Sequence, residues 1–403
     1  MVKRWVNIII LSVVILCSTS FYKFSFLGSF QSAFELMGTL IIFVLLLFHL
    51  IYSHQKSIKK NFTLAVILIV ISMITSMITA YITREQRIIH TMLAQRALYY
   101  YFLYFLLHQL KFDSRDLEKL IIFFAVLYIG LQLLQTVLYP IQIFDANLST
   151  DRGTLRIYIP GAHYIAIGFF MYLQKFLRSN KFYYTLLLLP IFWVYVMRGG
   201  RQPLAILILV TVLFVIIDRK VKSRVFMILL GSLGAFSAFL IFRDIFMALF
   251  IKSQQDIALG EEYIRIKCAR YYITDFFKSQ IAYITGNGMY YPHSKYGKLI
   301  ALNAIKYHYH LGDIGLIGNY AIYGLFFVLG VILISIKSLI IKIESEHVYL
   351  KYFVFAVILS IILGGGFANA DFICLCVMVL YLIDVSNQSY VQNNHEKKNS
   401  LVT

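Results

Sequence analysis

Charged side chains are scarce in this chain. Only 14% of its 403 residues are charged, against roughly 25% in soluble proteins. Its 37 basic residues outnumber 19 acidic ones, but the sequence contains no soluble basic domain that could hold nucleic acid. Cysteine is also rare, and Cys17, Cys374 and Cys376 fall within apolar segments, which excludes a disulfide-stapled fold. Hydrophobic residues, by contrast, make up 60% of the chain. This composition indicates a polytopic membrane protein.

Long apolar runs predict the topology. Because a spanning helix needs about 20 apolar residues, the sequence predicts an all-α transmembrane protein of about 12 spans. The expected spans lie near 6–21, 33–53, 62–82, 93–110, 119–139, 161–177, 182–197, 202–217, 224–242, 314–336, 349–366 and 369–385. The first is interpreted as a retained span, because no small-residue cleavage site follows it.

These spans define one transmembrane domain over residues 1–386 and a disordered cytoplasmic tail over 387–403. One large external loop, 243–313, interrupts the domain. Within this loop, the spacing of apolar residues predicts a helix over 256–281, and Gly286-Asn287-Gly288 is a turn signal that ends it.

The distribution of cations orients the chain. The expected inside loops and ends hold 20 Lys and Arg, the short outside loops hold 8, and the long outside loop holds 9. Lys and Arg concentrate on the cytoplasmic side of membrane proteins. We therefore expect both termini in the cytoplasm and the large loop on the opposite side.

Arginine and lysine are not distributed alike. Ten of the 15 arginines, but only seven of the 22 lysines, fall on the outside. Charge alone would not separate the two residue types, whereas guanidinium groups bind phosphate and carboxylate through two parallel hydrogen bonds. The asymmetry indicates an outward face that handles a phosphate-bearing substrate.

Two arginines flank a glycine turn between expected spans, in Arg198-Gly199-Gly200-Arg201-Gln202-Pro203. Pro203 suits the first turn of a helix, and a helix N-terminus beside two guanidinium groups is an anion-binding site. The alternative is a tight turn whose arginines reach lipid headgroups. We favour the anion site, because cations are less expected on the outer side.

Four more arginines are candidates for substrate binding. Arg152 and Arg156 precede the expected sixth span, where the alternative is an ordinary polar connection. Arg265 and Arg270 lie on the expected loop helix. Because they are five residues apart, they diverge by roughly 140° around a helix and need not bind the same atom. A solvated cationic face is the alternative for that pair.

Two histidines and an aspartate precede the span after the loop. His308, His310 and Asp313 are candidates for acid–base catalysis, since histidine exchanges protons near neutral pH. Metal binding is less favoured, because i, i+2 is not a helical ligand spacing and no other His or Cys cluster completes a site. The sequence therefore predicts neither a metal nor a cofactor. The alternatives are a histidine-lined membrane interface and an N-cap role for Asp313.

Three segments resemble the O-antigen polymerase and O-antigen ligase superfamily. Gly200-Arg201-Gln202-Pro203-Leu204-Ala205 resembles the family's Gly-Ser-Arg turn at the start of a span. Arg265 followed by Gly286-Asn287-Gly288 resembles its loop arginine and Gly-x-Gly turn. Asp313-Ile314-Gly315, with Gly318 and Gly324, resembles the acidic entry to the span after the large loop. This last motif is closer to the polymerase branch, since the ligase branch has a loop histidine followed by Asn.

The resemblance implies a metal-independent glycosyltransferase of the bacterial plasma membrane. Its substrate would be a polyprenyl-pyrophosphate-linked oligosaccharide, polymerised into an O-antigen, capsule or exopolysaccharide, with a chain-length regulator and a flippase as further partners. Arg201, helped by Arg198 and Arg265, would hold the pyrophosphate, and His308, His310 or Asp313 would accept the acceptor hydroxyl's proton. The alternatives are a ligase that transfers the finished glycan to a lipid or protein, and a flippase or exporter of lipid-linked sugar.

Overall fold

The computed structural model describes residues 2–52, 59–145, 148–149, 156–179, 181–198, 200–218, 220, 243–361 and 366–400. Within these ranges the chain is helical apart from loops and one antiparallel pairing of two-residue strands, so the all-α prediction is confirmed. The strands are β1 (Leu148–Ser149) and β2 (Arg156–Ile157).

The α-helices follow the apolar runs of the sequence. They are α1 (Val2–Ser18), α2 (Gln31–Tyr52), α3 (Thr63–Arg84), α4 (Ile88–Ala94), α5 (Leu103–Leu110), α6 (Ser114–Leu138), α7 (Ala162–Ser179), α8 (Thr185–Met197), α9 (Arg201–Ile217), α11 (Arg243–Ala258), α12 (Ile264–Thr274), α13 (Ala282–Thr285), α14 (Lys295–Tyr307), α15 (Gly315–Ile340), α16 (Tyr349–Ile361) and α17 (Ala370–Ser400). Short 3₁₀ turns connect them: η1 (Ser20–Lys23), η2 (Ser25–Phe30), η3 (Arg96–Phe102), η4 (Phe182–Tyr184), η5 (Gly260–Glu262), η6 (Leu311–Ile314), η7 (Ser345–His347) and η8 (Gly366–Ala368).

Five helical segments of the described chain are long and apolar enough to cross a membrane. They are Gln31–His49, Thr63–Arg84, Ser114–Leu138, Leu311–Ile340 and Ala370–Glu396. Arg4–Ser18, Leu188–Met197 and Gln202–Ile217 are shorter apolar helices. The expected span at 93–110 is divided among α4, η3 and α5. The one expected at 224–242 lies outside the described residues, and the count of twelve stays a prediction.

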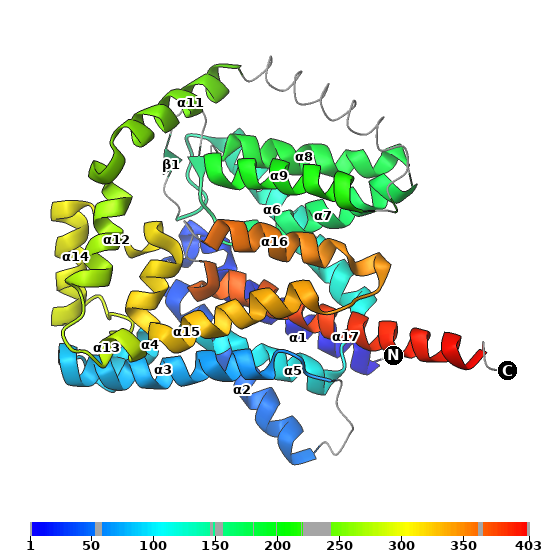
Figure 1. The fold of residues 1–403 in the computed structure, drawn as a ribbon, viewed down its shortest axis with the longest axis horizontal. Helices are drawn as coiled ribbons and strands as arrows, with labels where there is room; N and C mark the ends of the chain where they lie inside the picture. The colour runs from blue at the N-terminus through cyan, green and yellow to red at the C-terminus, as the bar shows by residue number, and fades with distance from the viewer. Residues whose placement is uncertain are drawn as a thin grey trace.

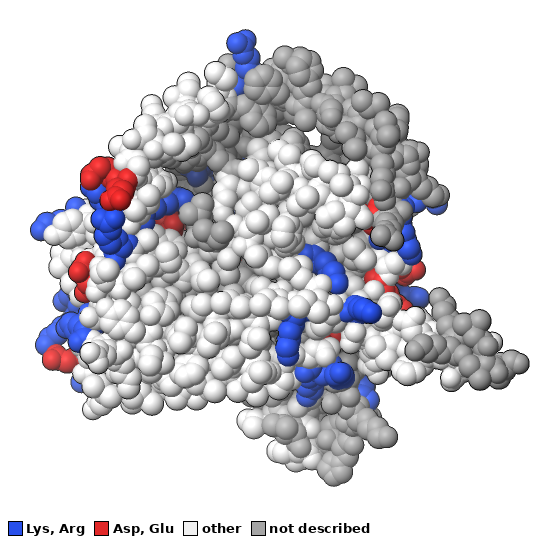
Figure 2. Space-filling model, viewed as in Figure 1, with Lys and Arg blue, Asp and Glu red and all other residues white. Residues whose placement is uncertain are grey.

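The long helices lie side by side in one bundle (Figure 1). At its centre is α17, in which every residue from Phe372 to Asp384 is buried. Both ends of the chain lie at the right of the bundle, whereas α12, α13 and α14 lie at the left. Figure 2 shows a broad uncharged band between the charged groups at these two ends. Such a band is what a helix bundle presents to lipid.

The turn that ends the loop docks on a kink in α15. At Gly324 the backbone of α15 leaves helical geometry, which frees the carbonyls one turn earlier. The N–H of Asn287 donates to Ala321 O at 3.1 Å, and that of Gly288 donates to Ile322 O at 2.8 Å. The predicted turn at Gly286-Asn287-Gly288 is therefore confirmed, and its role is to fasten the loop to α15.

The helix expected over 256–281 is wrong in extent. The structure has α11 up to Ala258, then η5, and α12 from Ile264 to Thr274. Gly260 adopts a φ of +48° and Tyr263 is extended, so the chain changes direction between the two helices. Cys268 and Tyr272 on α12 pack with Tyr296 of α14 in a small core of their own.

The tail expected to be disordered from residue 387 is helical, because α17 continues to Ser400. Two side-chain contacts hold this extension against the connection between α15 and α16. Asn387 Nδ2 donates to Lys342 O at 2.8 Å, and Asn393 Nδ2 donates to Glu344 Oε1 at 2.9 Å. Asn387 and Asn393 therefore anchor this extension of α17.

Candidate functional site

Two of the candidate arginines, from segments 42 residues apart, meet at one tyrosine. The guanidinium carbons of Arg156 and Arg198 lie 5.0 and 5.6 Å from the centre of the Tyr158 ring. Arg156 Nε also donates to Arg198 O at 3.2 Å. The ring holds the two like charges in place, because a cation is attracted to an aromatic face. We call Arg156, Tyr158 and Arg198 the arginine pair site.

The backbone around Arg198 follows from its sequence. α8 ends at Met197 with Arg198 as its C-cap, and the N–H of Arg198 still donates to Val194 O at 3.0 Å. Gly200 is the extended N-cap of α9, which begins at Arg201 with Pro203 in its first turn. The prediction that this glycine turn opens a helix is confirmed. The side chains of Arg201 and Arg152 lie outside the described part of the structure.

The imidazole of His163 lies within electrostatic range of both Arg198 and the carboxylate of Asp371. Asp371, in the first turn of α17, accepts from the N–H of Gly161 at 2.8 Å, just before α7 begins. His163, in the first turn of α7, packs edge-on against the Phe372 ring at 4.7 Å. Both Asp371 and Arg198 lie within electrostatic range of His163 and of Tyr128 on α6. The starts of α7 and α17 and the end of α8 thus gather an imidazole, a carboxylate and a guanidinium.

An ion pair extends this polar region further into the bundle. Arg96 Nε lies 2.7 Å from Glu35 Oε2, and Ser20 Oγ donates to Glu35 Oε1 at 3.2 Å. Asp371 is within electrostatic range of Glu35. The buried hydroxyl of Tyr22 lies within electrostatic range of Tyr128 and Asp371 and has no hydrogen-bond partner among the described residues. Unsatisfied buried polar atoms are uncommon in folded proteins and mark places that water or a ligand can fill.

Arg84, Arg96 and Arg270, which were expected outside, have partners away from the arginine pair site. Arg96 pairs with Glu35, and Arg270 pairs with Glu261 at 3.1 Å on the exposed surface of the loop. Arg84 is buried, and it donates to Asn287 Oδ1 at 2.9 Å and to Phe276 O. Part of the arginine excess therefore holds the fold together, whereas Arg156 and Arg198 are brought together at one tyrosine ring.

The candidate acid–base residues of the loop form a second group. His308 is the left-handed C-cap of α14, and His308, His310 and Asp313 are all exposed. His310 O accepts from Cys268 Sγ on α12 at 3.8 Å, which fixes this segment beside the helix that carries Arg265. Arg265 is half-buried on α12. The structure therefore brings the loop arginine and the loop histidines onto one local unit.

His163, Asp371 and Tyr158 were not predicted as site residues. Asp371 lies at the start of a very apolar span, and an ionisable residue in that position is a functional candidate by default. His163 lies seven residues after the candidate Arg156. Only the packing of α7 against α17 shows that the two belong together.

Within the described residues, no group of three or more His, Cys, Asp and Glu side chains is arranged to hold a metal ion. The sequence matches no family model, and no curated protein matches it at a significant level.

Proposed function

We propose that the protein is a membrane glycosyltransferase that polymerises polyprenyl-pyrophosphate-linked oligosaccharide repeat units into a surface polysaccharide. In this proposal the enzyme resides in a bacterial plasma membrane with twelve spans. Both termini are cytoplasmic, and the segment 243–313 lies on the other side. The reaction needs no metal, because arginine side chains supply the positive charge.

The observation that carries the proposal is the arginine pair site beside His163 and Asp371. A diphosphate leaving group carries negative charge that increases as its bond to the sugar breaks. Arg156 and Arg198 share one ring, which keeps both guanidinium groups oriented before the substrate arrives. Preorganised charge at the position where negative charge develops is a large term in enzymatic rate enhancement.

The proposed step is a displacement at the anomeric carbon of the donor glycan. The hydroxyl oxygen of the acceptor sugar forms a bond to that carbon, and the bond to the diphosphate oxygen breaks. The hydroxyl proton passes to a base of the protein, and polyprenyl diphosphate leaves. His163, held near Asp371, is the base that the arginine pair site favours. His308, His310 and Asp313, with Arg265, are the bases of the second group.

The test is substitution in cells that make the polymer. Arg198→Ala should shorten or abolish the polysaccharide, because loss of one preorganised donor costs about 10²–10³ in rate. Arg198→Lys should fall between Ala and the parent, since lysine keeps the charge but not the bidentate geometry. Arg87→Ala is the matched control, an exposed arginine also expected outside. Undiminished chain length in Arg198→Ala, at equal protein level, would contradict the proposal.

Two further comparisons assign the base and the reaction. His163→Asn should reduce activity more than His308→Ala or His310→Ala if the base belongs to the arginine pair site. The reverse order would assign the base to the loop histidines.

Deletion of the gene distinguishes a polymerase from a ligase. Lipid-linked single repeats should accumulate, whereas lipid-linked full-length polymer would indicate a ligase. Glycan extension by purified protein in detergent would exclude transport alone.

A further inference from the structure

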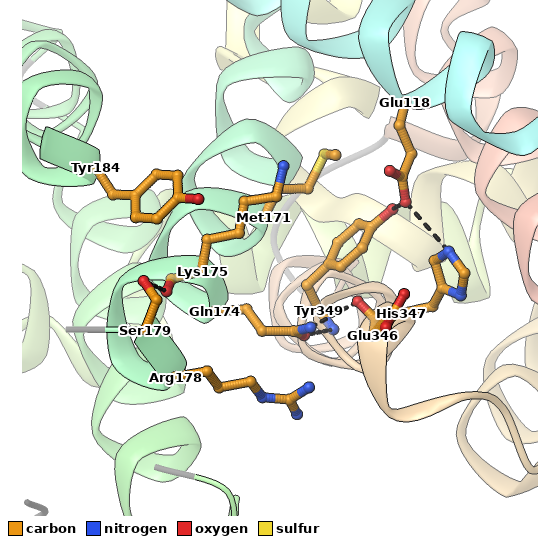
Figure 3. A pocket seen from close by; sticks show the side chains of 10 residues that line it. All are labelled: Glu118, Met171, Gln174, Lys175, Arg178, Ser179, Tyr184, Glu346, His347 and Tyr349. Atoms are coloured by element: carbon orange, nitrogen blue, oxygen red, sulfur yellow. Dashed lines mark hydrogen bonds and ion pairs between the residues drawn. The ribbon is translucent and has the colours of Figure 1, made fainter. Parts of the chain in front are cut away.

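A groove lies at the opposite end of α7 from His163. The helix has 18 residues, so its two ends are separated by about 25 Å. The groove joins a cavity of about 340 Å³ to one of about 500 Å³, and both are lined by Glu118, Lys175, Glu346 and His347. We call it the α6–α7 groove. It lies between the start of α6, the end of α7 and the η7 turn before α16 (Figure 3).

Two of the three carboxylates that line the groove are already bound. Glu118 Oε1 accepts from the Tyr349 hydroxyl at 2.7 Å and lies 3.3 Å from His347 Nε2 (Figure 3). Glu344 lies 3.7 Å from His347 Nδ1 and accepts from Asn393. Only Glu346 has a side chain with no hydrogen bond or ion pair to the rest of the described chain.

The cations of the groove are mostly without direct partners. Arg178 is bound to Asp218, with 2.5 Å between Nη2 and Oδ2. Arg115, Lys119 and Lys175 are exposed, and none of them has an ion-pair partner within 4 Å in the described part of the chain. Three unpaired cations therefore face one unpaired carboxylate. The groove keeps an excess of positive charge after its internal pairs are formed.

The wall of the groove is amphipathic. Met171 and Tyr184 give the smaller cavity an apolar side, and Ser179 adds a hydroxyl (Figure 3). Ser114 and Ser389 add hydroxyls to the larger one. A ligand that fits has an anionic head with several acceptor oxygens and an apolar part beside it. Basic pockets at the ends of spanning helices bind such phosphate-bearing lipid headgroups.

We propose that the α6–α7 groove binds a phosphate group, with Arg115, Lys119 and Lys175 as its cationic ligands. The phosphate belongs either to an anionic phospholipid of the adjacent leaflet or to a free phosphate in solution. This site is separate from the arginine pair site and does not depend on the proposed glycosyltransferase activity.

The experiment measures binding to the purified full-length chain in detergent by native mass spectrometry. Phosphatidylglycerol, diacylglycerol and inorganic phosphate are the probes. Phosphatidylglycerol should bind and diacylglycerol, which lacks phosphate, should not. Competition by inorganic phosphate would identify the free anion as a sufficient ligand, and its absence would identify the lipid. Equal binding of diacylglycerol and phosphatidylglycerol would overturn the proposal.

Charge variants locate the binding. Lys119→Gln and Lys175→Gln should each weaken phosphatidylglycerol binding roughly fivefold, as expected for one basic residue at an anionic lipid. Lys59→Gln, an exposed lysine outside the groove, should leave it unchanged. The double variant Lys119→Arg/Lys175→Arg should retain binding, which controls for a folding defect. Unchanged affinity for phosphatidylglycerol in the double variant Lys119→Gln/Lys175→Gln would refute the site. Arg198→Ala should not affect this binding, so the two proposals fail separately.

Discussion

Gly286 and Gly324 meet backbone to backbone. A Cβ on Gly286 would lie 2.3 Å from Ile322 O, and a Cβ on Gly324 would lie 2.3 Å from Ile284 O. Both glycines also adopt φ values near +77° with extended ψ, a region that only glycine occupies readily. This contact joins the segment 243–313 to α15, the helix that packs along α3.

Gly286→Ala and Gly324→Ala should each destabilise the protein by at least about 2 kcal/mol, because the backbone conformation is strained and the space is filled. Gly130→Ala is the control, since a Cβ there meets nothing within 4 Å and the residue lies inside α6. It should be neutral or slightly stabilising. Thermal unfolding in detergent measures all three. Equal unfolding midpoints for Gly286→Ala, Gly324→Ala and Gly130→Ala would show that the contact between Gly286 and Gly324 does not stabilise the protein.

Arg84 should contribute more to stability than to substrate binding. Arg84→Met would leave Asn287 Oδ1 and Phe276 O without their buried donor, at an expected cost of about 3 kcal/mol. It would also remove the guanidinium from the faces of Phe276 and Tyr296, 4.5 and 5.0 Å away. Arg87→Met, at an exposed arginine nearby, should change stability by less than about 0.5 kcal/mol. A lower unfolding midpoint for Arg84→Met alone is the expected result.

Asp384 holds three segments together inside the bundle. Its carboxylate accepts from the Tyr104 hydroxyl at 2.6 Å and from Asn61 Nδ2 at 2.7 Å, and it lies 3.1 Å from His108 Nε2. Asp384→Ala should cost about 3–5 kcal/mol, because the buried partners lose their acceptor. Asp275→Ala, at an exposed aspartate, is the control. Similar denaturant midpoints for the two variants would mean that the network contributes little.

Cys268 should react slowly at neutral pH. Burial on α12 raises the pKa of its thiol to about 11, with the Asp313 carboxylate adding to the shift. Because only the thiolate reacts, alkylation should accelerate about tenfold for each pH unit between 8 and 10. A cysteine placed by Lys298→Cys in a Cys268→Ser background should level off near its ordinary pKa of about 8.5. Mass spectrometry of iodoacetamide labelling measures both rates. Equally fast labelling at pH 7.5 would show that Cys268 is accessible.

The sequence predicted the elements better than their interruptions. Apolar runs located α3, α6, α15 and α17, because burial in lipid or protein requires continuous apolar surface. The break of the expected span at 93–110 into α4, η3 and α5 was not predictable from hydropathy. It depends on tertiary contacts, such as the Tyr100 hydroxyl donating to Glu35 O at 3.2 Å.

The site was predictable only in part. The glycine turn identified Arg198 and the start of α9, because glycine favours turns and proline favours the first turn of a helix whatever the rest of the fold is. The ten arginines counted outside also include Arg84 and Arg96, whose partners Asn287 and Glu35 are distant in sequence. Composition gives only the number of guanidinium groups, whereas packing shows which of them bind other parts of the fold, as Arg84 and Arg96 do.

The burial of α17 has a consequence for biosynthesis. Helix α17 packs against α5, α6 and α7, yet it is synthesised after all three. Until residues 372–384 emerge from the ribosome, the apolar surfaces meant for them have only lipid or each other as neighbours. The nascent bundle must therefore stay open enough for a late helix to enter its middle.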